Sequence, residues 1–186
     1  MQKLVPAAAI IEGEAFAPFS QIQNAFHYAV NNGAKIINCS WKIGNRSMMI
    51  SEGIQYARDH GVLVVCGAGN DGRNVDRGFP VDYPTDCTHD NILSCASTDR
   101  YDHLDINGLS NYTCPTSELV SSYGPTSVDI AAPGCDFCAD YPDAPSCGHS
   151  GTSVASPIVA GAAALLWQQN PTWTYLQIKN RLMRST

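Results

Sequence analysis

Residues 35–66, KIINCSWKIGNRSMMISEGIQYARDHGVLVVC, carry the pattern that decides the fold. Lys35–Ser40 and Val62–Cys66 are short apolar runs that predict buried strands. Between them, Met48–His60 predicts an amphipathic helix that ends at Gly61. Strands that are apolar without alternation, joined by helical crossovers, indicate a parallel sheet covered on both faces. The sequence therefore predicts an α/β protein with three layers, α/β/α.

The same alternation continues on both sides of this stretch. Upstream, Leu4–Ile11 predicts a strand, and Ser20 is expected to cap a helix that runs to Asn32 and stops at Gly33. The apolar face of that helix is formed by Ile22, Phe26, Ala29 and Val30. Downstream, Ile92–Ala96 predicts a fourth strand inside a long loop-rich region, Asp71–Ser150.

Two helices are predicted at the C-terminal end. The first begins near Thr152, runs through Trp167 and ends at Asn170-Pro171. The second begins at Thr174, because Thr174-Tyr175-Leu176-Gln177 has the form of a capping box, and continues to about Arg184. Without repeats or a low-complexity linker, residues 1–186 are expected to form one compact unit.

Composition excludes several classes of function. The chain of 186 residues is 44% hydrophobic and 15% charged, as in a soluble globular domain. Its net charge is −6 and its eleven Lys and Arg residues are scattered, which argues against binding to nucleic acid or to an anionic membrane. No apolar run reaches the length of a membrane helix. Lys3, Leu4–Ile11 and Ala15-Phe16-Ala17 imitate a signal peptide, but two acids interrupt the pattern and a buried strand is the preferred interpretation.

Eight cysteines are many for this length and suggest disulfides in a secreted or secretory-pathway protein. Three of them lie in apolar strand-like runs and are expected to be small buried residues: Cys39, Cys66 and Cys95. Five lie in polar loops and are the better disulfide candidates: Cys87, Cys114, Cys135, Cys138 and Cys147. Because five is odd, one loop thiol must be free or pair with a strand cysteine. Three sequons, at Asn38, Asn45 and Asn111, add weak support for secretion.

Ser153 is the strongest candidate for a chemical role. It lies in Gly148-His149-Ser150-Gly151-Thr152-Ser153-Val154-Ala155-Ser156-Pro157, at the start of a predicted Ala-rich helix. Small residues there allow close approach of a substrate, and the helix N-terminus offers free N–H groups and the positive end of its dipole. A tetrahedral acyl-transfer intermediate needs such an environment because it carries negative charge. Taken alone, the motif is more often an ordinary N-cap serine.

The longer segment around Ser153 changes the preference between a catalytic serine and an ordinary N-cap serine. GTSVASPIVAGAAALLWQQNPTWTYLQIKNRLMRST (151–186) closely resembles the region around the active serine of the subtilisin-like serine peptidases (subtilases). The resemblance extends over nearly the whole chain, including structural segments at 121–124 and 128–134. It implies the subtilisin-like fold, with residues 1–186 as a partial catalytic domain, and a serine endopeptidase that forms an acyl-enzyme on Ser153.

The resemblance also implies an oxyanion hole. In Val62–Gly72, VLVVCGAGNDG, Asn70 corresponds to the side-chain donor, and its amide would act together with the backbone N–H of Ser153. Alone, Asn70 would be an ordinary turn residue. Its place at the end of a buried parallel strand, where such sheets carry their sites, favours the functional interpretation.

Residues that would bind the polypeptide substrate follow from the same resemblance: Ser40, Trp41, Lys42, Gly67, Ala68, Gly69 and Thr152. Lys42 stands where the family usually has a glycine. It could make the pocket favour acidic or small side chains, although a lysine that points to solvent is the preferred interpretation.

The proton-transfer residues are missing from the sequence. A serine nucleophile needs a base, normally a histidine oriented by a carboxylate. The family carries them in Asp-Ser/Thr/Asp-Gly and His-Gly-Thr motifs, and neither motif occurs here. None of the five histidines (His27, His60, His89, His103 and His149) is followed by Gly-Thr, and His149 is too near Ser153 in sequence to serve as its base.

Three interpretations of this absence remain. The chain is the part of an endopeptidase downstream of Asp and His, inactive alone; or a scaffold or binding module that keeps the fold; or one half of a split enzyme whose partner supplies Asp and His. No cofactor is expected. Cys135-x2-Cys138-x8-Cys147-x-His149 fits disulfides better than zinc, and acidic loop residues such as Asp82 and Asp86 leave only a weak structural calcium site open.

Overall fold

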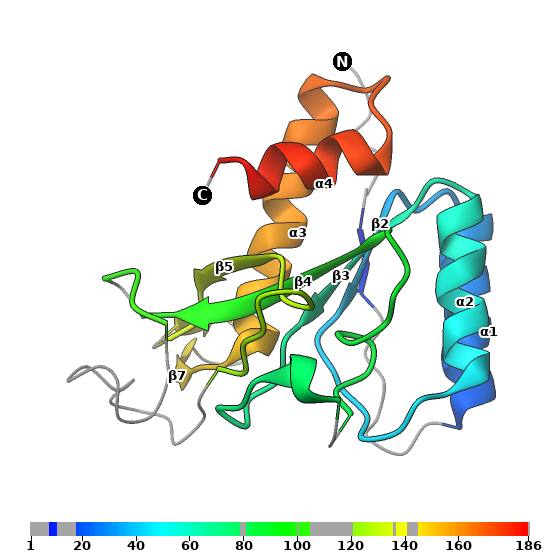
Figure 1. Cartoon of the computed structure of the whole chain (residues 1–186). Coiled ribbons are helices and arrows are strands. Elements are labelled where there is room, and N and C mark those ends of the chain that lie inside the picture. Colours follow the sequence, from blue (N-terminus) through cyan, green and yellow to red (C-terminus); the bar gives the residue numbers. More distant parts are fainter. Residues whose placement is uncertain are drawn as a thin grey trace.

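A parallel sheet flanked by helices on both sides forms the centre of the molecule (Figure 1). The computed structural model describes residues 8–10, 18–78, 81–99, 101–104, 121–135, 137–140 and 145–185. The strands lie in the order β1-β2-β3-β4-β5 and all neighbouring pairs are parallel. Their bounds are β1 Ala8–Ile10, β2 Ile36–Cys39, β3 Leu63–Gly67, β4 Ile92–Thr98 and β5 Ile130–Pro133. The predicted three-layer α/β/α architecture is confirmed.

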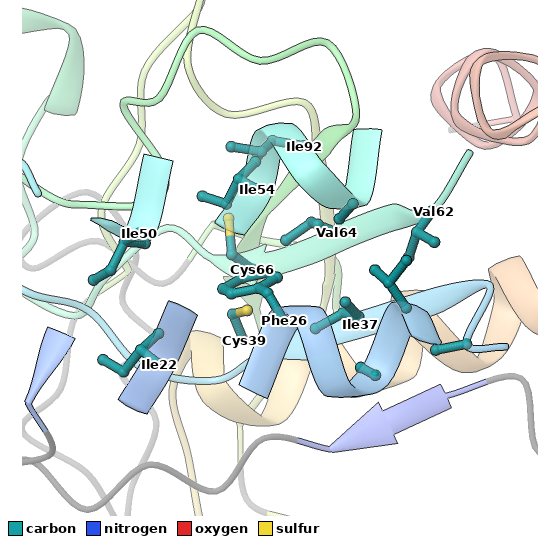
Figure 2. Packing of buried hydrophobic residues seen from close by; sticks show 14 of the residues in the cluster. Ile22, Phe26, Ile37, Cys39, Ile50, Ile54, Val62, Val64, Cys66 and Ile92 are labelled. Atoms are coloured by element: carbon teal, nitrogen blue, oxygen red, sulfur yellow. The ribbon is translucent and has the colours of Figure 1, made fainter. Parts of the chain in front are cut away.

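Strands β2, β3 and β4 contribute alternate side chains to two separate cores. Ile37, Val64 and Ile92 face a cluster formed with helices α1 (Phe19–Asn31) and α2 (Met48–Asp59), shown in Figure 2. Ile36, Leu63 and Leu93 face the opposite cluster, formed with helices α3 (Thr152–Gln169) and α4 (Tyr175–Met183). Both faces of the sheet are therefore covered, which explains why these strands are apolar without alternation.

The helices follow the predicted pattern, with one correction at a cap. The predicted buried face of α1, formed by Ile22, Phe26, Ala29 and Val30, is confirmed. Ser20 is not the N-cap, because the helix begins at Phe19 and the carbonyl of Pro18 accepts its first hydrogen bonds. The capping box of α4 forms as predicted between Thr174 and Gln177. Within the described ranges, no helix combines the length and apolar character needed to cross a membrane.

Part of the predicted loop region contains further elements. A short 3₁₀ helix, η1, covers Val75–Arg77, and β5 adds the last strand of the parallel sheet. Strands β6 (Phe137–Asp140) and β7 (Pro145–His149) form a separate antiparallel pair immediately before α3. The sequence predicted a loop-rich region here and did not locate these short elements. They lack the long apolar runs on which the prediction depended.

Four cysteines are free thiols: Cys39, Cys66, Cys87 and Cys95. The burial predicted for the three strand cysteines is confirmed. The expectation of a disulfide at Cys87 is wrong, since its thiol lies 3.3 Å from the Tyr83 hydroxyl and packs against the α1–α2 core. Cys114 and the side chains of Cys138 and Cys147 lie outside the described residues.

Candidate active site

Ser153 lies in the first turn of α3 and its side chain is exposed. The helix begins after Gly151, whose φ of 122° is unfavourable for a residue with a β-carbon. A β-carbon on Gly151 would also lie 3.0 Å from Nδ2 of Asn70. Glycine is therefore required here both for the backbone turn and for the approach of Asn70 to the helix N-terminus.

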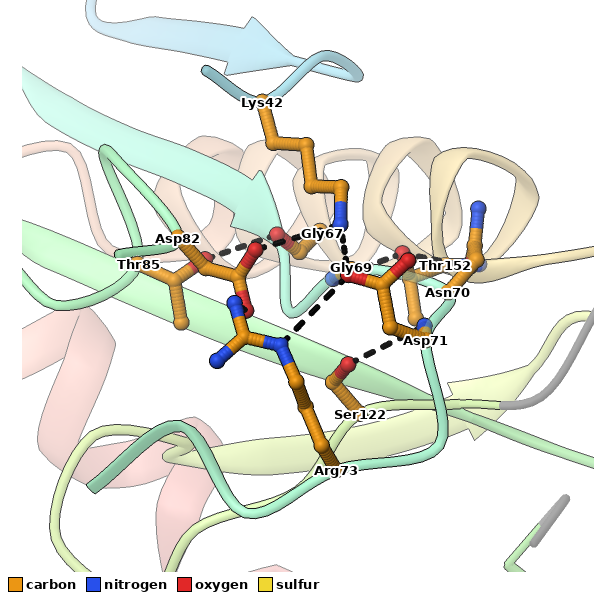
Figure 3. Close-up of polar contacts among 10 residues, drawn as sticks. All are labelled: Lys42, Gly67, Gly69, Asn70, Asp71, Arg73, Asp82, Thr85, Ser122 and Thr152. Atoms are coloured by element: carbon orange, nitrogen blue, oxygen red, sulfur yellow. Dashed lines mark hydrogen bonds and ion pairs between the residues drawn. The ribbon is translucent and has the colours of Figure 1, made fainter. Parts of the chain in front are cut away.

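Asn70 lies three residues beyond the carboxyl end of β3 and is hydrogen-bonded to the start of α3. Its Oδ1 accepts hydrogen bonds from the backbone N–H of Thr152 (2.9 Å) and from the Thr152 hydroxyl (3.0 Å). The hydroxyl oxygen of Thr152 in turn accepts from the N–H of Gly69 (3.1 Å). These bonds fix which end of the amide is oxygen, so that Nδ2 points away from Thr152 (Figure 3). Nδ2 remains oriented as a donor at the edge of the Ser153 site.

Ser40, at the end of β2, holds the first turn of α3 from the other side. Its hydroxyl donates to the backbone carbonyl of Ser153 (3.0 Å) and lies 3.1 Å from the hydroxyl of Ser156. Asn38 Nδ2 donates to the same Ser40 oxygen (2.8 Å). The buried Asn38 thus anchors a chain of polar contacts that positions Ser153 relative to β2.

A cleft of about 130 Å³ joins these elements. It is lined by Ser40, Trp41, Lys42, Gly67, Gly69, Asn70, Thr152 and Ser153. All the residues singled out from the sequence line it except Ala68, which is fully buried below it. The carboxyl ends of β2 and β3 therefore meet the N-terminus of α3 at one place, as expected for a site in a parallel α/β sheet. The roles of these residues stay predictions.

Lys42 is exposed, as expected, but its ammonium is paired with two carboxylates. Its ammonium contacts Asp71 Oδ2 and lies 3.2 Å from Asp82 Oδ1 (Figure 3). Arg73 pairs with the same two acids, at 2.5 Å from Asp82 and 3.5 Å from Asp71. The hydrogen bond from Lys42 lowers the pKa of Asp71 despite partial desolvation, so this carboxylate is charged at neutral pH. Two cations and two carboxylates thus form one network at the side of the cleft.

This network was missed in the sequence, except for the position of Lys42. Asp71 and Arg73 follow the GAGN segment, and their alternating charges were the only local signal. Asp82 comes from a distant loop, and its carboxylate is only 2% exposed. A buried acid could not be paired with Lys42 from the sequence, because the pairing depends on how that loop folds back.

No histidine lines the described part of the cleft. His27 and His60 stack on either side of Tyr56, between helices α1 and α2. His89 lies 3.0 Å from the Ser51 hydroxyl, and His103 pairs with Asp99. Among the residues described, no group of three or more His, Cys, Asp or Glu side chains is arranged to hold a metal ion.

Comparison with known proteins identifies the family to which this arrangement belongs. Residues 3–186 match the sequence model of the subtilase family of serine peptidases (Peptidase_S8), and the chain belongs to that family. It is 31% identical to Subtilisin BL of Lederbergia lenta over 176 residues, 95% of this chain and 58% of that protein. It is 34% identical to Alkaline elastase YaB of Bacillus sp. (strain YaB) over 163 residues, 88% of this chain and 38% of that protein.

Solved structures show the same fold. The S41 Psychrophilic Protease superposes with a TM-score of 0.70 at 26% identity, covering 92% of this chain and 56% of that one. Sphericase gives 0.69 at 25% identity, covering 90% and 55%. The chain thus spans less than two thirds of the length of these relatives.

Proposed function

We propose that this chain is the nucleophile-bearing part of a serine endopeptidase. Ser153 Oγ would attack the carbonyl carbon of a peptide bond, and the carbonyl oxygen would become an oxyanion held by Asn70 Nδ2 and the Ser153 N–H. The observation that carries the proposal is the fixed Asn70 amide, whose oxygen is held by Thr152 in the same cleft that the exposed Ser153 lines. Preorganised donors of this kind stabilise developing negative charge without reorganisation.

The proposed reaction passes through an acyl-enzyme. As the C–O bond to Ser153 forms, the hydroxyl proton passes to a base, which then protonates the amine that leaves when the peptide C–N bond breaks. Water, deprotonated by the same base, hydrolyses the ester and restores Ser153. We propose that the base and its carboxylate come from polypeptide outside residues 1–186, and that the chain alone is inactive. The scheme requires no cofactor.

The exposed face of α3 supports the proposal that further polypeptide packs against this helix. Helix α3 buries one side against the sheet and exposes the other, where Ile158 and Leu165 lie, and Ser153 in its first turn is exposed as well. The exposed positions carry no charged side chain: Ser153, Pro157, Ile158, Gly161, Ala162, Leu165, Gln168 and Gln169. A helix that is largely apolar all round is normally buried on all sides. We propose that the polypeptide that supplies the base also covers this face.

A catalytically silent scaffold is the second candidate, because the described cleft contains no base. The two are distinguished by reacting the longest natural polypeptide that contains this chain with a fluorophosphonate probe. The peptidase predicts covalent labelling that maps to Ser153 and disappears in Ser153→Ala, while Ser185→Ala, a matched serine outside the cleft, retains it. Labelling is also expected to be absent from residues 1–186 alone. A natural polypeptide that neither reacts nor cleaves casein, alone or with a second chain that carries the Asp and His motifs, would establish the scaffold instead. If labelling appears only after a second chain is added, the enzyme is split.

We further propose that the protein acts in an oxidising, secretory compartment. Cys135 is disulfide-bonded, and the register of the β6–β7 pair places Cys138 opposite Cys147, which supports disulfides in the segment that precedes Ser153. Peptide mapping of the secreted protein without reduction is expected to find cross-linked peptides from this segment. Recovery of all its cysteines as free thiols would contradict the proposal.

A further inference from the structure

We propose that Lys42 closes the side-chain pocket beside Ser153 and makes the protein select a small, uncharged residue on the acyl side of the scissile bond. This inference rests on the proposed function, because it concerns how the same cleft binds substrate. It assigns Lys42 as a specificity-determining residue, held in place by Asp71, Asp82 and Arg73.

The position of the substrate side chain follows from the proposed attack. The scissile carbonyl carbon must lie at Ser153 Oγ with its oxygen toward Asn70 Nδ2. The adjoining α-carbon then directs its side chain into the rest of the cleft, between Trp41-Lys42 on one side and Gly67–Gly69 on the other. Since the same cleft must also hold the peptide group itself, only part of it remains for this side chain.

The Lys42 side chain narrows that remaining space. A β-carbon on Gly69 would lie 3.4 Å from Lys42 Cδ and 3.6 Å from Asp82 Cγ, so both groups lie directly against the Gly69 wall. Movement of Lys42 has a cost, because its ammonium would lose contacts to two carboxylates, Asp71 and the buried Asp82, and Asp82 would keep only Arg73. The aliphatic part of Lys42 therefore acts as a fixed wall of the pocket.

The charges of the network disfavour a charged substrate side chain. Lys42 and Arg73 balance Asp71 and Asp82, which leaves no net charge. A substrate lysine would have to displace Lys42 from Asp82, and a substrate glutamate would find an ammonium group that is already paired. Each would lose hydration in the cleft without gaining an ion pair, so a small neutral side chain binds best.

The test uses the longest natural polypeptide and tetrapeptide p-nitroanilides that differ only in the residue whose carbonyl is attacked: Ala, Phe, Lys or Glu. The unmodified protein is expected to show at least a tenfold higher kcat/KM for Ala than for each of the others. Lys42→Ala removes both the wall and one positive charge. It is expected to raise kcat/KM for Lys relative to Ala by at least tenfold, and to raise that for Phe as well.

Two further variants separate size from charge. Lys42→Met removes the charge but keeps most of the volume, so Phe and Lys should remain poor substrates. Arg46→Ala makes the same change in net charge at a side chain that is 68% exposed and does not line the cleft, so the preference should not change. An original preference for Lys, Phe or Glu would overturn the inference, as would an unchanged ranking in Lys42→Ala.

Equilibrium binding of the corresponding tetrapeptide acids, measured by calorimetry, gives the same ranking without turnover. This measurement separates the proposed peptidase activity from the proposed role of Lys42. Absence of both fluorophosphonate labelling and hydrolysis would reject the peptidase activity. The binding series would still decide whether Lys42 determines which side chain binds. If Lys42→Ala does not fold, the ranking of the unmodified protein and of Lys42→Met decides, and Lys42→Met must then retain the preference for Ala.

Discussion

At the scale of single residues, the orientation of Asn70 depends on Thr152, which donates to Asn70 Oδ1 from both its backbone and its hydroxyl. The sequence indicated Asn70 and Ser153 because each lies in a distinctive motif at the end of a strand or at the start of a helix. It could not indicate that the two are connected through Thr152, because such a contact depends on the relative position of β3 and α3. The candidate site was therefore predictable as a set of residues, but its hydrogen bonds were not.

Replacement of Asn70 by Ala is expected to reduce kcat and leave KM nearly unchanged, because the lost donor acts on the oxyanion rather than on the bound substrate. In a subtilisin the loss of one such donor costs about 10²–10³-fold in kcat, and we expect a similar loss here. Steady-state kinetics of the natural polypeptide would measure it. Asn45→Ala, an exposed asparagine away from the cleft, serves as the control. A rise in KM without a fall in kcat would show that Asn70 binds substrate instead.

The strand thiols are expected to resist alkylation. Burial raises the pKa of Cys66 and of Cys95 to about 12, and burial also raises the pKa of Cys39. At pH 8 only about one such thiol in ten thousand is ionised, and the thiolate is the reactive form. Half-buried Cys87 should therefore react first with iodoacetamide, as measured by peptide mass mapping, and all four should react in denaturant. Rapid labelling of Cys66 or Cys95 in the native protein would show that the sheet opens locally.

At the scale of elements, the contact between β3 and the first turn of α3 determines the geometry of the site. Gly67 ends β3, and a β-carbon there would lie 2.8 Å from Thr152 Oγ1 and 3.0 Å from the Thr152 carbonyl oxygen. Those distances leave no room for a methyl group, because the nearest atoms include backbone. The strand and the helix can approach this closely only with glycine at this position.

Gly67→Ala is therefore expected to push Thr152 away from β3. Overpacking of this kind costs about 1–3 kcal/mol of unfolding free energy, and kcat should fall as well, because Thr152 orients Asn70. Denaturant unfolding and steady-state kinetics would measure the two effects. Gly44→Ala is the matched control, since no atom lies within 4 Å of its built β-carbon and its φ is not positive. If Gly67→Ala changes neither quantity, the contact is looser than the structure has it.

Among the elements, long apolar segments were predictable and short mixed ones were not. Strands β2 and β3 and all four helices are located within about two residues of their predicted ends, because burial on both faces of the sheet and the helical period leave strong patterns. Strand β5 is four residues long and only one of them is buried, so its sequence carries no comparable signal. It forms because β4 offers a free edge, which is a property of the assembled sheet.

At the scale of the whole molecule, one core lies between the sheet and helices α1 and α2, and the other lies between the sheet and helices α3 and α4. One side of α3 is not covered by the described residues. Leu165 is 64% exposed there. If the polypeptide that carries the base covers this face, Leu165 becomes a core residue in the natural protein. Its contribution to stability should then depend on how much of that protein is present.

Leu165→Ala in the longest natural polypeptide is expected to lower the unfolding free energy by about 2–5 kcal/mol, the cost of truncating a buried leucine. Met48→Ala is the matched control, because Met48 is 80% exposed at the start of α2, far in the sequence from the uncovered face, and its replacement should cost no more than about 0.5 kcal/mol. Chemical denaturation of both variants gives the comparison. An equally small cost at Leu165 would mean that nothing packs on this side of α3. The uncovered face of α3 would then no longer support the proposal that further polypeptide supplies the base.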